Sequence, residues 1–261
     1  MSVPKLVSPE TETRARIIGI TQRACAVAQT AVDNAISALC DPSPASFRAV
    51  SECEKQLDAL DQELDEKIAS ALTQVSEPEA RELLCCLKFM IYLERIGDLL
   101  WSFVGRVRGI GTQIPTEDMK DLTWMATTLQ KMLLEVYQAF SLQDLDRAIW
   151  VFRADSEIDR RRNLIFIRHL ENQGGVAGNH SAHVLLMAQA IERAGDHAKN
   201  VAEEVCHLLS GHTMRHLLRN YDKPDEERYL EHLRRGSRTP LKAVSAFSEI
   251  SSSLNRQLTV L

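Results

Sequence analysis

The sequence is poor in aromatic residues, glycine and proline. Aromatics make up 5% of its 261 residues, and it contains 11 glycines and 8 prolines. Strands favour aromatic and β-branched residues, and the turns between them rely on Gly and Pro. This scarcity argues against a β-sandwich or barrel and favours helices. No uncharged apolar run approaches the roughly 18 residues of a membrane span, and the N-terminus lacks the apolar stretch of a signal peptide. We expect a soluble, cytoplasmic protein.

The cysteines and the charge exclude further classes. None of the six cysteines forms a Cys-x-x-Cys pair, and Cys85 and Cys86 are adjacent. This pattern indicates reduced, buried thiols rather than a disulfide framework or a zinc site. The net charge of −5 argues against nucleic acid as the main partner.

Helical periodicity runs through most of the chain, and the few breakers divide it into six predicted helices. Ser76 and Glu79 form a capping-box pattern at the start of the third helix, and a loop with Gly109, Gly111 and Pro115 follows that helix. The expected helices cover roughly residues 10–40, 45–75, 76–108, 116–141, 145–171 and 180–211.

The third helix of each triplet carries the same motif. Glu-Arg-x-Gly-Asp occurs at residues 94–98 and again at 192–196. An internal duplication explains this order better than chance does. The sequence therefore predicts an all-α fold of two tandem three-helix bundles, each with its own core, over residues 1–112 and 113–220. Residues 221–261 are rich in charge and serine, and we expect a C-terminal appendage there, partly helical or flexible.

Each repeat also carries a second acidic pair, on its second helix. Two carboxylates four residues apart share one helix face and repel each other unless a cation lies between them. All-oxygen ligands suit Mg²⁺, Mn²⁺, Ca²⁺ or iron. Gly97 and Gly195, inside the motif helices, are expected to permit close approach of another helix or a ligand. The predicted metal ligands are Glu54, Asp58, Glu94, Asp98, Asp155, Asp159, Glu192 and Asp196.

Other interpretations of the same residues stay open. Arg95 and Arg193 would neutralise the motif carboxylates in a salt-bridge network, and the run Arg160-Arg161-Arg162 is typical of a solvated face. A carboxylate-bridged di-iron or di-manganese enzyme needs two Glu-x-x-His pairs, and the sequence offers one, Glu204 with His207. The third alternative is a helical scaffold whose acidic pairs bind no metal.

The second motif resembles a family signature. Residues 190–203 read AIERAGDHAKNVAE, which is similar to the ERxGDHxxNxAE signature of the PhoU family of phosphate-signalling regulators. A glycine followed shortly by Arg-His, at residues 211–216, also resembles that family, and the resemblance covers roughly residues 10–220.

The resemblance implies a function as well as a fold. It implies a two-bundle protein, often dimeric, that binds metal ions such as Mg, Mn, Fe or Zn on its acidic surfaces and is not an enzyme. Such a protein would act beside a phosphate ABC transporter with its ATPase and beside a sensor histidine kinase. It would restrain phosphate uptake and the phosphate-starvation response, and it would meet the membrane only through these partners.

Two departures from the family pattern matter. Ser102 occupies the position that Asn200 has in the second repeat, so we expect the first site to bind metal less tightly than the second. The tail beyond residue 221 has no clear family counterpart.

Overall fold

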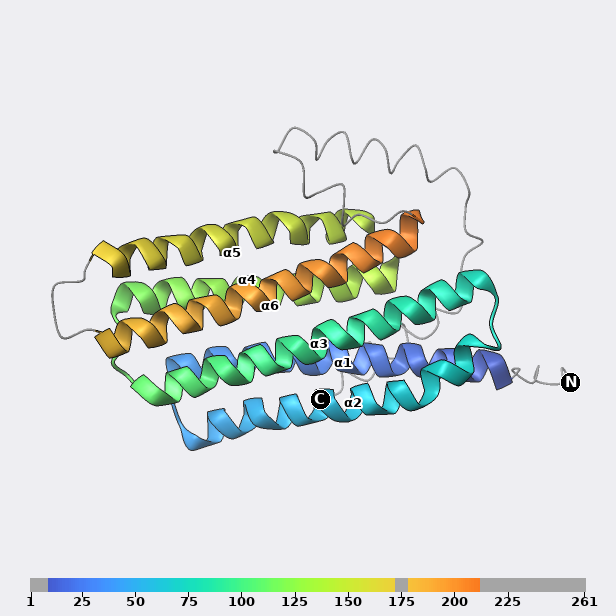
Figure 1. Ribbon diagram of the computed structural model, residues 1–261, viewed down its shortest axis with the longest axis horizontal. Helices are drawn as coiled ribbons and strands as arrows, with labels where there is room; N and C mark the ends of the chain where they lie inside the picture. The colour runs from blue at the N-terminus through green and yellow to red at the C-terminus, as the bar shows by residue number, and fades with distance from the viewer. Residues whose placement is uncertain (1–8, 172–177, 212–261) are drawn as a thin grey trace, which may run out of the picture.

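The computed structural model describes residues 9–171 and 178–211, which form six α-helices and, within those residues, no strand (Figure 1). All six predicted helices are confirmed, with ends within a few residues of the expected ones. The predicted tail, 221–261, lies outside the described residues. The helices are α1 (Pro9–Cys40), α2 (Pro44–Leu72), α3 (Glu77–Ile110), α4 (Thr116–Leu142), α5 (Leu145–Glu171) and α6 (Gly178–Ser210).

Local sequence explains where α3 begins and ends. The backbone N–H of Ser76 donates to Glu79 Oε2 at 3.0 Å, and the Ser76 hydroxyl donates to the same oxygen at 2.7 Å. This confirms the predicted capping pair at the helix start. The helix ends at Gly111, whose φ of 56° lies in the left-handed region that glycine adopts at little cost.

The helices form two three-helix bundles that lie side by side. Helices α1–α3 make the first bundle and α4–α6 the second, with α3 against α6 and α1 against α4 (Figure 1). Helices α3 and α6 run antiparallel. Lys88 pairs with Glu204 near one end of this contact, and Gly109 lies beside His183 near the other. The two Glu-Arg-x-Gly-Asp motifs therefore lie on the central pair of helices.

The expectation of two separate cores is wrong. The buried apolar side chains of all six helices form one continuous cluster that crosses the contact between the bundles. Phe89 of α3, for example, packs against Phe140 of α4 with ring centroids 4.9 Å apart. Helices α3 and α6 each have one apolar face toward their own bundle and another toward the other bundle. Burial of the second of these faces joins the two halves into one core.

Buried ion pairs fix α5 against its neighbours. Asp118 and Asp121 are buried on α4, and both accept hydrogen bonds from Arg168. Arg161 also donates to Asp121, at 2.8 Å, while the next residue, Arg162, reaches Glu192 on α6 at 3.1 Å. The arginine run was expected to be a solvated face, and for these two residues that interpretation is wrong. None of the described helices has an apolar stretch that could cross a bilayer.

Candidate functional site

A glycine in each motif lets two helices approach closely. A Cβ added to Gly97 would lie 2.7 Å from Leu57 Cδ1 and 3.8 Å from the Cα of Glu54, both on α2. A Cβ added to Gly195 would lie 3.4 Å from Ile158 Cδ1 on α5. This confirms the expected role of the two glycines. The close approach brings the acidic pairs of the second and third helix of each bundle together.

In the first bundle these pairs form what we call the first cluster: Glu54, Asp58 and Asp61 of α2 with Glu94 and Asp98 of α3. Burial raises the pKa of Glu54, and the charges of Asp58 and Asp98 raise it further. Burial and Asp98 likewise raise the pKa of Glu94, with smaller contributions from Asp58 and Asp61 against the opposing effect of Arg95. The carboxylates of the two helices therefore repel one another across the α2–α3 contact.

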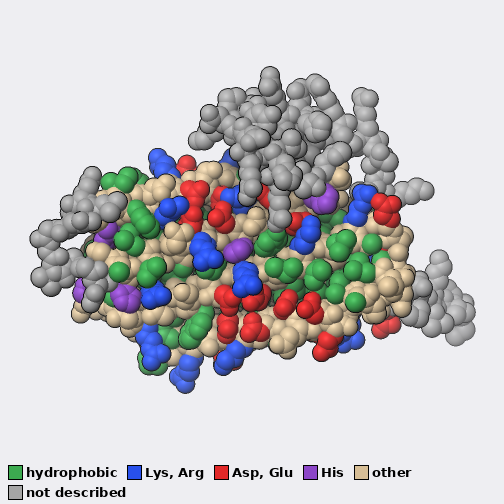
Figure 2. All heavy atoms as spheres, in the orientation of Figure 1, with side chains coloured by type: hydrophobic (Ala, Val, Ile, Leu, Met, Phe, Trp, Pro, Cys, Tyr) green, Lys and Arg blue, Asp and Glu red, His purple; other side chains and the backbone are tan. Residues whose placement is uncertain are grey.

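Among the described residues, Arg95 is the one cation in ion-pair contact with the first cluster, and Lys55 lowers the pKa of Glu54 without pairing with it. Arg95 lies 3.4 Å from Glu94 and 3.6 Å from Asp98, but its side chain is 60% exposed. Figure 2 shows acidic side chains gathered over α2 and α3, whereas acidic and basic side chains are interspersed over α5 and α6. An exposed arginine is screened by water and offsets little of the repulsion.

The second cluster comprises Asp155 and Asp159 of α5 with Glu192 and Asp196 of α6, and it contains cations. Lys199 Nζ lies 2.5 Å from Asp155 Oδ2 and 2.8 Å from Asp196 Oδ1, so it bridges the two helices. Arg162 pairs with Glu192 at 3.1 Å. Burial raises the pKa of Asp155 to about 6 despite the attraction of Lys199. Burial disfavours the charge of Lys199, but Asp155 and Asp196 together raise its pKa.

The duplication identifies which residues make the difference. The offset of 98 residues that relates Glu94 to Glu192 also relates Trp101 to Lys199. The offset of 101 that relates Glu54 to Asp155 also relates Asp61 to Arg162. Where the second cluster has two cations, the first has an indole and a further carboxylate.

Sequence reasoning missed Asp61, Arg162 and Lys199, although a signal for them exists. Each lies three residues beyond a predicted ligand, on the same face and one helical turn further along. Extending each acidic pair from i, i+4 to i, i+4, i+7 identifies all three residues.

The structure brings all eight predicted ligands into two clusters, one per bundle, and the donor sets differ in their fit to a metal ion. As the side chains are placed, no three His, Cys, Asp or Glu residues of the described chain stand at metal-ligand geometry. The first cluster offers only carboxylate oxygens as donors. They come from two helices, and their negative charges repel one another. Oxygen-only donors are the kind that a hard cation prefers. In the second cluster, three of the four carboxylates, Asp155, Asp196 and Glu192, already contact a cation of the chain.

Nearby histidines do not extend either cluster. His197 is half-buried and stacks on Tyr92 with ring centroids 5.9 Å apart. Burial lowers its pKa, and Arg193 lowers it further. Glu204, the acid of the single Glu-x-x-His pair, accepts from Lys88 at 2.7 Å about two turns along α6 from Asp196. The Glu-x-x-His pair thus lies outside both clusters, which weakens the interpretation as a ferritin-like enzyme.

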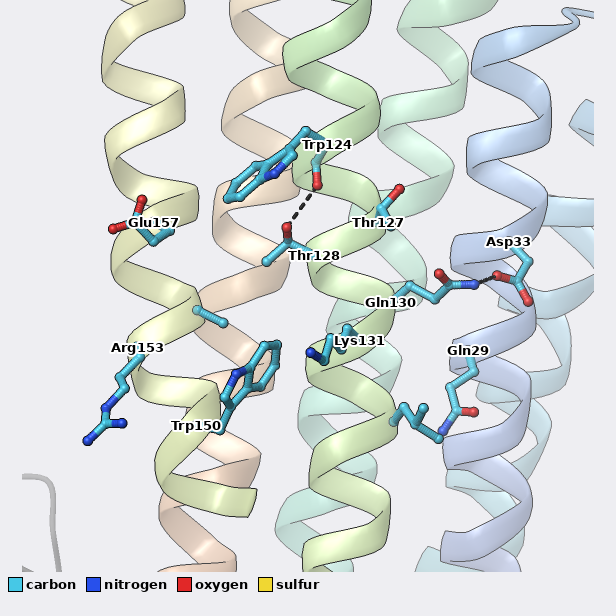
Figure 3. A pocket seen from close by; sticks show the side chains of 12 residues that line it. Gln29, Asp33, Trp124, Thr127, Thr128, Gln130, Lys131, Trp150, Arg153 and Glu157 are labelled. Atoms are coloured by element: carbon cyan, nitrogen blue, oxygen red, sulfur yellow. Dashed lines mark hydrogen bonds between the residues drawn. The ribbon is translucent and has the colours of Figure 1, made fainter. Parts of the chain in front are cut away.

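A pocket lies elsewhere, where α1, α4 and α5 meet (Figure 3). Trp124 and Trp150 line it, and Lys131 lies over the Trp150 ring at 4.4 Å from the centroid. Gln130 on α4 donates to Asp33 on α1 across its edge. The pocket is framed by indoles, amides and dispersed charges, so its chemistry differs from that of the two carboxylate clusters.

Comparison with known proteins agrees with this duplicated architecture. The sequence matches the PhoU domain twice, over residues 21–107 and 122–205, and these segments contain the two clusters. A Thermotoga maritima protein called phosphate-specific transport system accessory protein PhoU homolog 1 is 28% identical over 200 residues, covering 75% of this chain and 86% of the relative. A PhoU homolog of the same description from Caulobacter vibrioides is 30% identical over 190 residues, covering 71% of this chain and 83% of the relative.

Solved structures share the fold. The crystal structure of PhoU from Pseudomonas aeruginosa superposes with a TM-score of 0.71 at 23% identity, covering 77% of this chain and 99% of that one. The phosphate transport system regulatory protein PhoU from Streptococcus pneumoniae gives a TM-score of 0.70 at 17% identity, covering 78% and 98%. Because the domain match spans both bundles and more than half of the sequence, this chain belongs to the PhoU family.

Proposed function

We propose that this chain is an accessory regulator of a phosphate-specific transport system and that it binds a metal ion on its first cluster. Its relatives are named accessory proteins of that system. The observation that carries the metal proposal is the first cluster itself, in which five carboxylates from two helices have, among the described residues, the exposed Arg95 as their ion-pair partner, on Glu94 and Asp98. Mg²⁺, Mn²⁺ or iron is the kind of cation that such a donor set accepts.

The proposed role of the ion is electrostatic. Bound between α2 and α3, it would neutralise the acidic patch and hold the two helices together. A neutralised face would meet an acidic or phosphate-bearing partner without the repulsion that the metal-free face imposes. We propose that the transporter ATPase and a sensor histidine kinase are the partners, contacted from the cytoplasmic side by a homodimer. In this role the protein has no catalytic step of its own and restrains the phosphate-starvation response when phosphate is plentiful.

Metal binding is tested by equilibrium dialysis against Mn²⁺ after treatment with a chelator. Wild type should retain Mn²⁺, and Glu94→Gln/Asp98→Asn should lose it while its helical circular dichroism persists. The matched control is Glu77→Gln/Glu117→Gln, which removes two exposed carboxylates that pair with Arg81 and Lys120 outside the cluster. Equal Mn²⁺ retention by wild type and the cluster variant would contradict the metal proposal.

The regulatory role is tested in cells with a transcriptional reporter of phosphate starvation. Deletion should leave the reporter active at high phosphate, and a wild-type copy should silence it again. A copy with Glu94→Gln/Asp98→Asn should fail to silence it, whereas the control pair should succeed. A reporter that stays silent after deletion would show that the chain has a different role from its relatives' description.

A further inference from the structure

The second cluster does not fit a metal ion as the first does, because a side chain of the protein already lies where a cation would bind. The Lys199 ammonium contacts one carboxylate on each helix, Asp155 on α5 and Asp196 on α6. The Asp155 side chain is 5% exposed and that of Lys199 26%, so this arm of the bridge is shielded from water, whereas Asp196 is 48% exposed. A divalent ion bound to the same carboxylates would sit beside the ammonium and be repelled by it.

Arg162 completes the neutralisation. It donates to Glu192 Oε1, and Gln189 donates to the other oxygen of the same carboxylate. Both oxygens of Glu192 therefore have partners within the chain, and its ion pair is mostly buried. A metal ion would have to displace these hydrogen bonds from a largely buried carboxylate, which costs free energy.

We infer that Lys199 and Arg162 take the place of a metal ion in the second cluster, so that this chain binds metal in its first half alone. The statement about the first half rests on the proposed function, and the statement about the second half stands on the ion pairs. This inference is the reverse of the expectation that Asn200 makes the second site bind metal more tightly than the first. An amide at position 200 adds one neutral donor, but Lys199 adds a full positive charge beside the carboxylates.

The test is a gain of metal binding. In a background where the first cluster is disabled by Glu94→Gln/Asp98→Asn, equilibrium dialysis should find no Mn²⁺ on the chain although the second cluster is intact. Adding Lys199→Met leaves Asp155 and Asp196 without their cation, so these two carboxylates with Asp159 should bind one equivalent of Mn²⁺, and Asp155→Asn/Asp196→Asn should abolish the binding. Lys199→Arg keeps a cation and should bind none. Lys120→Met, an exposed lysine on α4, is the matched control.

A second readout covers the case in which Lys199→Met folds poorly. In chelator its melting temperature should fall below that of the background, and Mn²⁺ should restore it, whereas Mn²⁺ should leave Lys120→Met unchanged. Mn²⁺ held by the second cluster with Lys199 in place would overturn the inference. A folded Lys199→Met protein that gains no Mn²⁺ would do the same.

The two proposals fail in different ways. Wild type without Mn²⁺ would contradict the proposed function, yet a gain of Mn²⁺ in Lys199→Met would still support the inference about the second cluster.

Discussion

In the first half of the chain, five carboxylates lie on α2 and α3, and two of them pair with the exposed Arg95. In the second half, three of the four carboxylates on α5 and α6 pair with Lys199 or Arg162. The helix contact is built in a similar way in both halves, with Gly97 and Gly195 each against an aliphatic residue of the neighbouring helix. The difference teaches that a duplicated framework fixes where carboxylates meet. Two side chains one turn further along decide what neutralises them.

The largest expected effect distinguishes the two counter-ions. In chelator at pH 7.5, Lys199→Met should lower the free energy of unfolding by on the order of 3 kcal/mol, because it leaves Asp155 buried without its partner. Arg95→Met removes the counter-ion of the first cluster and should change the free energy of unfolding by about 0.5 kcal/mol or less, since Arg95 is exposed. Urea unfolding of both variants measures the difference. If both variants lowered the free energy of unfolding equally, Lys199 would not be a buried counter-ion distinct from the exposed Arg95.

The same experiment has a pH dependence with a definite sign. Burial raises the pKa of Asp155 to about 6, and removing Lys199 would raise it further. Below that range Asp155 is neutral in the folded protein with or without its partner. The penalty of Lys199→Met should therefore shrink as the pH falls from 7.5 to 5, and a penalty that grows instead would contradict this account.

Gly97 and Gly195 should differ in how well they tolerate alanine. A Cβ at Gly97 would lie 2.7 Å from Leu57 Cδ1, and Leu57 is fully buried, so its side chain would have to shift within the packed core. We expect Gly97→Ala to destabilise by about 1–2 kcal/mol, since overpacking outweighs the gain in helix propensity. At Gly195 the nearest contact would be 3.4 Å, which is tight but tolerable, so Gly195→Ala should stay within about 1 kcal/mol of wild type. Thermal unfolding of both variants tests this order.

The sequence predicted the helices and the acidic pairs but not the basic side chains that neutralise the second cluster. Helix ends follow from local signals such as the Ser76–Glu79 cap, and Glu94 and Asp98 share a face because of helix geometry alone. The single core was missed because periodicity shows an apolar stripe and not which bundle covers it. Arg161 and Arg162 were missed for a related reason: adjacent arginines point in different directions, one to Asp121 and one to Glu192.

A lysine placed in the first cluster at the position of Lys199 should weaken metal binding there. Trp101 is 40% exposed and occupies the position that corresponds to Lys199, so Trp101→Lys places an ammonium beside Asp98 without disturbing the core. We expect Mn²⁺ affinity at the first cluster to fall by at least about tenfold, which corresponds to ~1.4 kcal/mol. Trp101→Met removes the indole without adding charge and is the control. Isothermal titration of both variants measures the change, and similar affinities would show that residue 101 does not reach the carboxylates.

The smallest expected effect comes from repulsion within the metal-free first cluster. Burial and then neighbouring carboxylates raise the pKa values of Glu54 and Glu94, so the folded chain binds protons at these groups more readily than the unfolded chain. The uptake of these protons therefore stabilises the folded chain fully at a pH below the ordinary pKa near 4.5. This stabilisation is lost as the pH rises through the raised pKa values of the folded chain. Glu54→Gln/Glu94→Gln removes this loss. In chelator the variant should match wild type near pH 4 and exceed it at pH 7 by about 0.5 kcal/mol, the size of a like-charge pair on a helix. The exposed pair Glu77→Gln/Glu117→Gln should show no such gain. A variant less stable than wild type at pH 7 would mean that these carboxylates already have a partner that stabilises their charge, as in the second cluster.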